Sequence, residues 1–235
     1  MRASALVLPL ALCACDHVTP VTMSGRILDG PYEDADPVAS PTLEVRDVQA
    51  EVFDTVEGDE DGSFEVQVPG GQFFTVMMSA DGYVPTSLSG MAAAGDFEAG
   101  DGALWAMSDQ EYADLQELWA GCPGADTAGG IAVGQVLLYT GEDATAYTVT
   151  AGTVTLYTSD GGSLDGCYLD NDGTAGSTGL ETGNTGRFGF FGTPEGASTL
   201  LLTFEVGDVV EGPYQWPVWI PADGVAPLYP AYVEL

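Results

Sequence analysis

Alternation of apolar and polar residues along most of the chain predicts short β-strands. In the clearest example, Phe64, Val66 and Val68 are separated by single polar residues. A period of two places these three side chains on one face of a strand and the polar ones on the other. Comparable runs recur between clusters of Gly, Pro and Asp. The pattern predicts an all-β protein built from antiparallel β-sandwiches.

The segment from Ser108 to Trp119 is an exception, because its apolar residues have helical spacing. Ser108 and Glu111 have the spacing of a capping box. Tyr112, Leu115 and Trp119 fall on one face, and a glycine and a proline soon afterwards end the helix. We expect a short helix that packs on the first sandwich and leads to the second.

A repeated order of elements predicts how the strands are arranged. The turn-strand-turn segment 62–71 is similar to 186–196, and each is followed by a second β-rich run, at 73–78 and 199–204. We predict that each of these two pairs forms a hairpin. Each pair is also preceded by an apolar strand that begins with Gly and by an alternating strand.

Self-similarity over this length predicts two domains. We expect antiparallel β-sandwiches at residues 20–105 and 130–235, joined by a helix and linker at residues 106–129. The second sandwich carries a Gly/Thr-rich insertion at residues 172–186, which has too little apolar content to order itself. This insertion is either a contact loop, a site of O-linked modification or a tolerated spacer.

The composition of the chain excludes several classes of catalytic and binding site. The chain has 235 residues, with 36 Asp or Glu against four Arg and no Lys, so its net charge is −32, and His17 is its single histidine. Lysine-dependent catalysis, phosphate loops and metal sites of several histidines are therefore excluded. Nucleic acid is excluded as a partner, because phosphate backbones are bound through Lys and Arg clusters. The charge favours weak, non-specific association with divalent cations.

The N-terminus indicates export. A basic residue precedes an apolar run that is too short to span a membrane, so residues 1–14 have the layout of a signal peptide. Leu12, Ala14 and Cys15 resemble the lipobox of bacterial lipoproteins. That resemblance implies a lipid on Cys15, cleavage before it and a lipidated tether at residues 15–19. It also implies an anchor in the bacterial cell envelope, periplasmic or surface-facing, in a membrane that the sequence does not identify. An ordinary signal peptide without lipid is the alternative.

The first predicted sandwich also resembles a known family. Its features are a strand with Gly, a Pro before the next strand, an Asp-x-Asp-Gly-Ser-Phe turn, a Pro-Gly-Gly turn, an aromatic strand and an Asp-Gly-Tyr-x-Pro corner. The residues that carry them are Gly25, Pro41, Asp59, Asp61, Gly62, Ser63, Phe64, Pro69, Gly70, Gly71, Phe73, Phe74, Asp81, Gly82, Tyr83 and Pro85. They resemble the carboxypeptidase regulatory-like domain, which implies a seven-stranded, transthyretin-like, non-catalytic module. The resemblance covers residues 20–105 and, more loosely, 130–235.

Cys122 and Cys167 are the two cysteines that follow the N-terminal segment. Export to an oxidising compartment favours a disulfide between them, which would tie the helical linker to the second sandwich. The alternative is a pair of buried free thiols.

Two acidic turns, Asp59–Gly62 and Asp170–Gly173, offer the oxygen ligands that calcium prefers. Neither has the spacing and terminal Glu of an EF-hand loop. Asp and Asn ahead of Gly also form Asx-turns. We therefore expect turns at these positions, and we predict no metal site and no cofactor.

Trp216 and Trp219, with Tyr214 nearby, are candidates for a platform on which sugar rings stack. In a strand, residues three apart lie on opposite faces, which argues against a single platform. Packing in a core or an interface is the alternative.

The chain has no nucleophile elbow, zinc motif or phosphate loop. A pair of carboxylates for glycoside hydrolysis is the catalytic option that stays open. We predict a non-enzymatic cell-envelope lipoprotein that acts as a structural or interaction module, for display or adhesion, on an envelope protein or a glycan. The alternative is a carbohydrate-binding module that uses the aromatic residues of the second domain.

Overall fold

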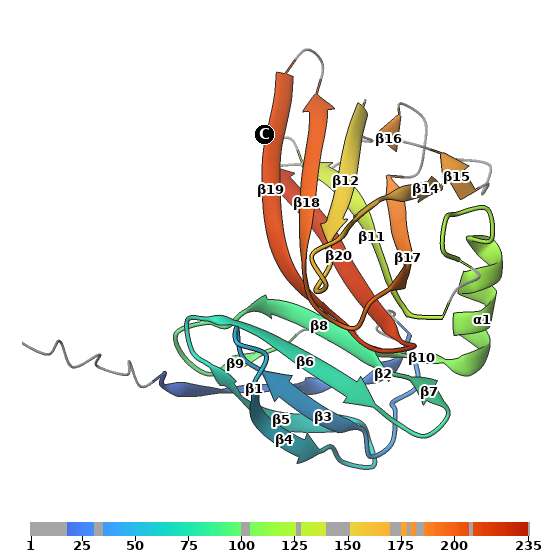
Figure 1. Ribbon diagram of the computed structural model, residues 1–235. Helices are drawn as coiled ribbons and strands as arrows, with labels where there is room; N and C mark the ends of the chain where they lie inside the picture. The colour runs from blue at the N-terminus through green and yellow to red at the C-terminus, as the bar shows by residue number, and fades with distance from the viewer. Residues whose placement is uncertain are drawn as a thin grey trace, which may run out of the picture.

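The computed structural model describes residues 18–30, 35–99, 104–125, 128–139, 151–169, 175–177, 180–181, 186–206 and 209–234. Within these residues the chain has twenty strands and one helix. They form two β-sandwiches, one from the first half of the chain and one from the second, as Figure 1 shows. The predicted all-β fold class is therefore confirmed. The signal peptide, Cys15 and most of the 172–186 insertion lie outside the described residues.

The first sandwich has two main layers and a third, short sheet. In chain order its strands are β1 (Pro20–Arg26), β2 (Leu28–Asp29), β3 (Thr42–Arg46), β4 (Val52–Glu57), β5 (Ser63–Pro69), β6 (Phe73–Ser79), β7 (Tyr83–Val84), β8 (Thr86–Met91), β9 (Phe97–Glu98) and β10 (Trp105–Ser108). One layer has the order β5-β1-β9 and the other the antiparallel order β8-β6-β3-β4. Strands β2, β10 and β7 make the short sheet.

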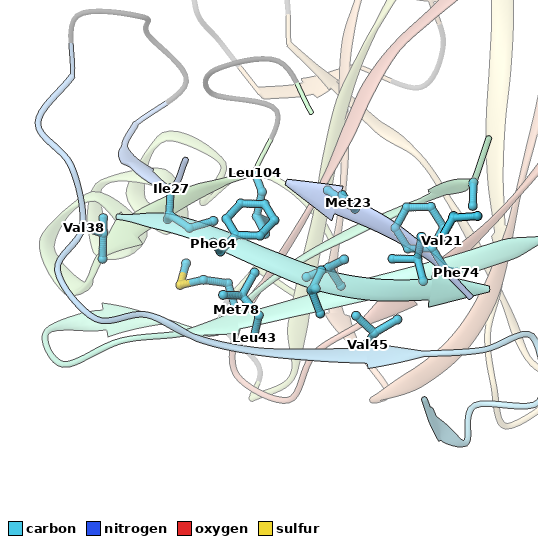
Figure 2. Packing of buried hydrophobic residues seen from close by; sticks show 14 of the residues in the cluster. Val21, Met23, Ile27, Val38, Leu43, Val45, Phe64, Phe74, Met78 and Leu104 are labelled. Carbon is cyan, nitrogen blue, oxygen red and sulfur yellow. The ribbon is translucent and has the colours of Figure 1, made fainter. Parts of the chain in front are cut away.

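The core of the first sandwich lies between its two main layers. Phe64, Val66 and Val68 of β5 are buried and the polar residues between them are exposed, so the alternation predicted this strand correctly. They pack with side chains of the opposite layer such as Leu43 and Val45. Figure 2 shows residues from both layers pointing into this shared interior. Burial of each such side chain contributes roughly 1.5–3 kcal/mol of hydrophobic free energy.

The second sandwich also has two layers. Its strands are β11 (Gly130–Tyr139), β12 (Ala151–Tyr157), β13 (Ser163–Asp165), β14 (Cys167–Leu169), β15 (Ala175–Ser177), β16 (Leu180–Glu181), β17 (Arg187–Thr193), β18 (Gly196–Val206), β19 (Val209–Ile220) and β20 (Val225–Glu234). One layer has the order β15-β14-β17-β11-β20, and the other has the order β13-β12-β18-β19 with β16 beside β12. Leu156, Tyr168 and Phe190 are among the largest fully buried side chains of its core.

The same pairings occur in both sandwiches, but the predicted hairpins are wrong. Strand β5 pairs with β1 in one layer, whereas β6 pairs with β3 in the other. In the second sandwich β17 pairs with β11, and β18 pairs with β12 in the opposite layer. The turn after β5 and the turn after β17 therefore cross between layers. Alternation shows that a strand buries one face, and a hairpin and a crossover satisfy that pattern equally well.

Helix α1 (Asp109–Leu118) follows β10 where the capping box predicted it. The Ser108 hydroxyl accepts a hydrogen bond from the Glu111 N–H at 3.2 Å, and the Glu111 carboxylate accepts one from the Ser108 N–H at 2.8 Å. The reciprocal pair satisfies two N–H groups that a helix start leaves without partners. No helix among the described residues is both long and apolar enough to cross a membrane.

The acidic turn ahead of β5 is held by its own side chains. Asp61 accepts hydrogen bonds from the Ser63 hydroxyl at 2.6 Å and from the Ser63 N–H at 3.1 Å, and it pairs with Arg26 at 3.1 Å. The two bonds from Ser63 are the main cause that lowers the pKa of Asp61 below its ordinary value, and Arg26 adds to them. The turn thus has the Asx-type geometry. Among the described residues, no group of three or more His, Cys, Asp or Glu side chains could hold a metal ion.

We predict that Gly62→Ala destabilises the protein more than Gly71→Ala. Both glycines have positive φ, 79° and 69°, so an alanine costs about 1 kcal/mol at either position. A Cβ on Gly62 would also lie 2.6 Å from the Ile27 carbonyl oxygen, whereas a Cβ on Gly71 would meet no atom within 4 Å. Urea unfolding should show a loss of about 1 kcal/mol for Gly71→Ala and roughly 3 kcal/mol for Gly62→Ala. Equal losses would contradict the close approach at Gly62.

Candidate functional site at the joint of the two sandwiches

Strands β8 and β20 join the two sandwiches into one sheet. They run parallel at Thr86 and Val225, and the Val225 N–H donates to the Pro85 carbonyl at 2.8 Å. The Ile131 N–H donates to the Gly224 carbonyl at 2.8 Å, which ties the same corner to β11. A side chain at Gly224 would collide with the Pro85 carbonyl, so the close approach requires glycine there. The result is a nine-stranded sheet, β15-β14-β17-β11-β20-β8-β6-β3-β4, that runs from one core into the other.

The backbone of Trp219 is clamped by two serines of β8. The Ser87 hydroxyl donates to the Trp219 carbonyl at 2.6 Å, and the Trp219 N–H donates to the Ser89 hydroxyl at 3.1 Å. The Ser89 hydroxyl is also 2.7 Å from that of Thr75 on β6. Strand β19 of the second sandwich is therefore tied by side chains to β8 of the first, and β6 holds one of these side chains in place. These bonds are partly buried, and the loss of either partner would leave a polar group unsatisfied.

The ring of Trp219 lies under an arginine of the first sandwich. The Arg46 guanidinium carbon is 4.8 Å from the ring centroid, a cation–π contact between the two sandwiches. Arg46 is oriented by an ion pair with Glu44 at 2.6 Å and by a hydrogen bond to the Ala50 carbonyl at 3.0 Å. A cavity of about 210 Å³ lies beside this pair, with Phe73 in its wall. The arrangement makes Trp219 an element of the joint.

A third group of buried side chains fills the joint on the helix side. It combines Val84 and Met107 of the first sandwich, Trp119 after the helix, and Phe191 and Val225 of the second. The rings of Trp119 and Phe191 are tilted at 39° with their centroids 5.5 Å apart. Because one apolar cluster is shared, separation of the sandwiches would expose buried surface from both of them.

Cys122 and Cys167, the two cysteines that the sequence favours as a disulfide, are joined by one in this structure. Their Cα atoms are 5.8 Å apart and 45 residues separate them in the chain. Both are buried in the same apolar cluster as Trp119. The bond links the segment after α1 to strand β14, so it adds a covalent tie to the joint.

Trp216 and Trp219 have different surroundings and do not form one aromatic platform. Trp216 is half-buried against the second core and stacks with Tyr214 at 6.0 Å between centroids, with 25° between the ring planes. Trp219 belongs to the joint described above. Their opposite faces follow from the three-residue spacing, and carbohydrate binding stays a prediction.

The carboxylates of the described residues gather mainly on open surface. A shallow cavity of about 660 Å³ on the first sandwich is lined by Glu57, Asp59, Glu65 and Glu98, together with Arg26. Weak association of divalent cations with such a surface stays a prediction.

One carboxylate is perturbed in the direction that a general acid needs. Burial is the main cause that raises the pKa of Asp29, and the nearby charge of Glu111 raises it further, while a hydrogen bond with Tyr83 acts in the opposite direction. Asp29 is not among the residues that line the three cavities described above and below.

Three polar residues of the joint, Ser87, Ser89 and Arg46, carry no signal in the sequence. Ser87 and Ser89 are two residues apart on β8, a spacing that places both on one face. Nothing in that spacing indicates a partner at Trp219, 130 or more residues away in the chain. Arg46 likewise carries no sequence signal for the ring it covers. A buried strand face is readable from sequence, but the element that covers it is not.

We predict that peptide mapping without reductant finds Cys122 linked to Cys167. Closing a loop of this length should stabilise the protein by about 4 kcal/mol in the chain-entropy description. Reduction should therefore lower the unfolding midpoint. The Cys122→Ser/Cys167→Ser variant is the control, since a reductant should leave its midpoint unchanged. Two alkylatable thiols in the folded, non-reduced protein would contradict the disulfide.

Comparisons with known proteins give distant likenesses. No protein-family model matches the chain and no curated protein is similar to it, so the carboxypeptidase regulatory-like resemblance stays a prediction. Among solved structures, the Bacillus anthracis TIE protein is similar over 91% of this chain and 34% of its own, with 12% identity and a TM-score of 0.30. The shaft pilin SpaA of Lactobacillus rhamnosus GG is similar over 92% of this chain and 99% of its own, with 12% identity and a TM-score of 0.27. The minor pilin GBS52 of Streptococcus agalactiae is similar over 91% of this chain and 94% of its own, with 11% identity and a TM-score of 0.29. This chain spans about a third of the Bacillus protein and nearly the whole of the two pilins, and TM-scores this low carry no function from those proteins to this one.

Proposed function

We propose that this protein is a non-enzymatic structural and interaction module of the bacterial cell envelope, tethered through a lipid on Cys15. Its role is mechanical: the two sandwiches act as one stiff unit that presents loops and sheet edges to a partner. The observation that carries the proposal is the joint, in which β8 and β20 continue one sheet from core to core.

Stiffness follows from the number of independent contacts at the joint. Three kinds of contact oppose the movement of one sandwich against the other. They are the backbone pairing at Val225, the bonds of Ser87 and Ser89 with the Trp219 backbone, and the shared apolar cluster. Flexible domain pairs have small and more polar interfaces. A module that transmits position or load from an anchor needs a stiff interface between its domains, because a loose hinge would absorb the movement.

The charge fits a tethered role. Residues of the mature chain are strongly acidic, so anionic lipid headgroups repel the body of the protein. The lipid chains would therefore hold it at the membrane while the sandwiches stand away from the surface. Repulsion between like-charged copies would also oppose their aggregation.

We predict that the described sandwiches unfold as one cooperative unit in calorimetry. Ser87→Ala/Ser89→Ala removes the two hydroxyls that clamp the Trp219 backbone and leaves a carbonyl and an N–H without these partners. Each unsatisfied group costs about 1–3 kcal/mol. The variant should therefore broaden the transition or split it in two, and lower the midpoint.

Ser198→Ala is the matched control for that experiment. Ser198 is a buried serine of the second sandwich whose hydroxyl has no hydrogen-bond partner, so its removal deletes the same atom without loosening the joint. Its transition should stay single and as narrow as that of the wild type, with a midpoint that is equal or higher, because the removed hydroxyl is buried and unsatisfied. Two independent transitions in the wild-type protein, or equal behaviour of the two serine variants, would contradict a stiff joint.

We predict that Cys15→Ser releases the protein from the membrane fraction or leaves an unprocessed precursor. The reason is that a hydroxyl cannot form the thioether that the lipobox resemblance implies. The measurement is cell fractionation with intact-mass analysis, and Cys13→Ser is the matched control, because Cys13 precedes the expected cleavage site. A Cys15→Ser protein that is processed normally and stays with the membrane would refute the anchor.

A further inference from the structure

A separate apolar pocket lies between helix α1 and the second sandwich. Its volume is about 310 Å³, which is at the small end of the range for ligand sites, about 300–1,000 Å³. Trp105, Trp119 and Phe188 supply aromatic wall, and Leu115 and Leu118 of α1 supply aliphatic wall. Leu118 is 45% exposed, so part of this wall is open to solvent. The pocket thus has the size and lining of a site for a small apolar group.

One edge of the pocket is polar and positively charged. Gln135 of β11 and Arg187 of β17 are directly opposite each other in an antiparallel pair, so their side chains leave the sheet on the same face. Val133, two residues from Gln135, shares that face and lines the same pocket. Both polar residues already have interaction partners within the protein. A guanidinium has five N–H donors in a planar fork, which is enough to hold an anion as well.

The sign of the charge at this pocket is opposite to that of the molecule. None of the twelve described residues that line it is acidic, and Arg187 is the single charged one among them, in a chain with 36 acids and four arginines. The repulsion of an anion by distant carboxylates is screened beyond about 8 Å at physiological ionic strength. The attraction between an anion and Arg187 in direct contact at the rim is screened much less. Within the lining of the pocket, the formal charge therefore favours an anionic group, which would share Arg187 with the partner that this residue already has.

We propose that this pocket binds a small amphipathic carboxylate, with its apolar body between the tryptophans and helix α1 and its carboxylate on Arg187 and Gln135. A carboxylate fits because it accepts two parallel hydrogen bonds from a guanidinium. The apolar body fits because the remaining wall offers aromatic and aliphatic side chains. The site shares Trp119 with the joint, but ligand binding and cooperative unfolding are separate measurements, so either proposal can fail without the other.

The test uses the indole N–H signals of the chain's four tryptophans in ¹⁵N-labelled protein. Decanoate, decanol and decyltrimethylammonium are added separately, below their micelle-forming concentrations. Decanoate should shift the signals of Trp105 and Trp119 saturably and leave those of Trp216 and Trp219 in place. It should bind roughly two- to fivefold more tightly than the neutral alcohol, because Arg187 is exposed and an exposed ion pair contributes a factor of that size.

Two variants assign the recognition to the proposed residues. Arg187→Gln should weaken decanoate roughly two- to fivefold and leave decanol unchanged. Leu118→Glu should weaken both, because it places a carboxylate on the apolar wall. Arg26→Gln, which removes an exposed arginine of the first sandwich, is the charge-matched control. The proposal is overturned if the cationic probe binds most tightly, if the Trp216 or Trp219 signals move instead, or if Arg187→Gln keeps full affinity for decanoate.

Discussion

The short parallel contact between β8 and β20 determines how the rest of the molecule is arranged. Each strand would otherwise end its own sheet with a row of unpaired N–H and C=O groups, which is costly where side chains cover it. The bond from Val225 to Pro85 pairs the two edges at one position, and it requires the two backbones to approach so closely that only glycine is tolerated at residue 224. Once this contact exists, Trp219 is brought over β8, where Ser87 and Ser89 hold its backbone. The joint is therefore a consequence of sheet continuity, and the contacts of the Trp219 side chain reinforce it.

The sheets that meet at this contact are not equivalent members of the repeat. In the first sandwich the continuing layer contains the β3·β6 pair, whereas in the second it contains β11·β17, which corresponds to β1·β5. Two copies of one element order are thus joined through opposite layers. The helix side of the seam holds α1, the shared apolar cluster and the Cys122–Cys167 disulfide. The apolar pocket lies there too, because a cylindrical helix cannot fill the space against a twisted sheet completely.

Local features of the fold could be predicted from sequence, and long-range ones could not. The alternation around Val66 and the capping box at Ser108 depend on neighbours a few residues apart, so the strand and the helix start were readable directly. Which strands pair is decided by register and by the element that covers each apolar face. The turn from β5 to β6 obeys the same local rules as a hairpin, yet it crosses between layers. The same limit applies to the candidate site. The aromatic residues near position 216 stood out by type, but the arginine that covers Trp219 is 173 positions earlier in the chain, and no pattern connects the two.

Charge composition explains why the joint is built as it is. With four arginines against 36 acids, ion pairs cannot hold two domains together, and the arginines at Arg26 and Arg46 pair with carboxylates of their own sandwich. Contact between two acidic surfaces would be repulsive. The joint therefore uses groups without net charge, namely backbone amides, serine hydroxyls, apolar side chains and a disulfide. Arg46 on the Trp219 ring is a partial exception, and its charge is already balanced by Glu44, so the ring meets a neutralised pair. Such a joint is insensitive to ionic strength, because salt screens charged contacts and leaves buried neutral ones intact.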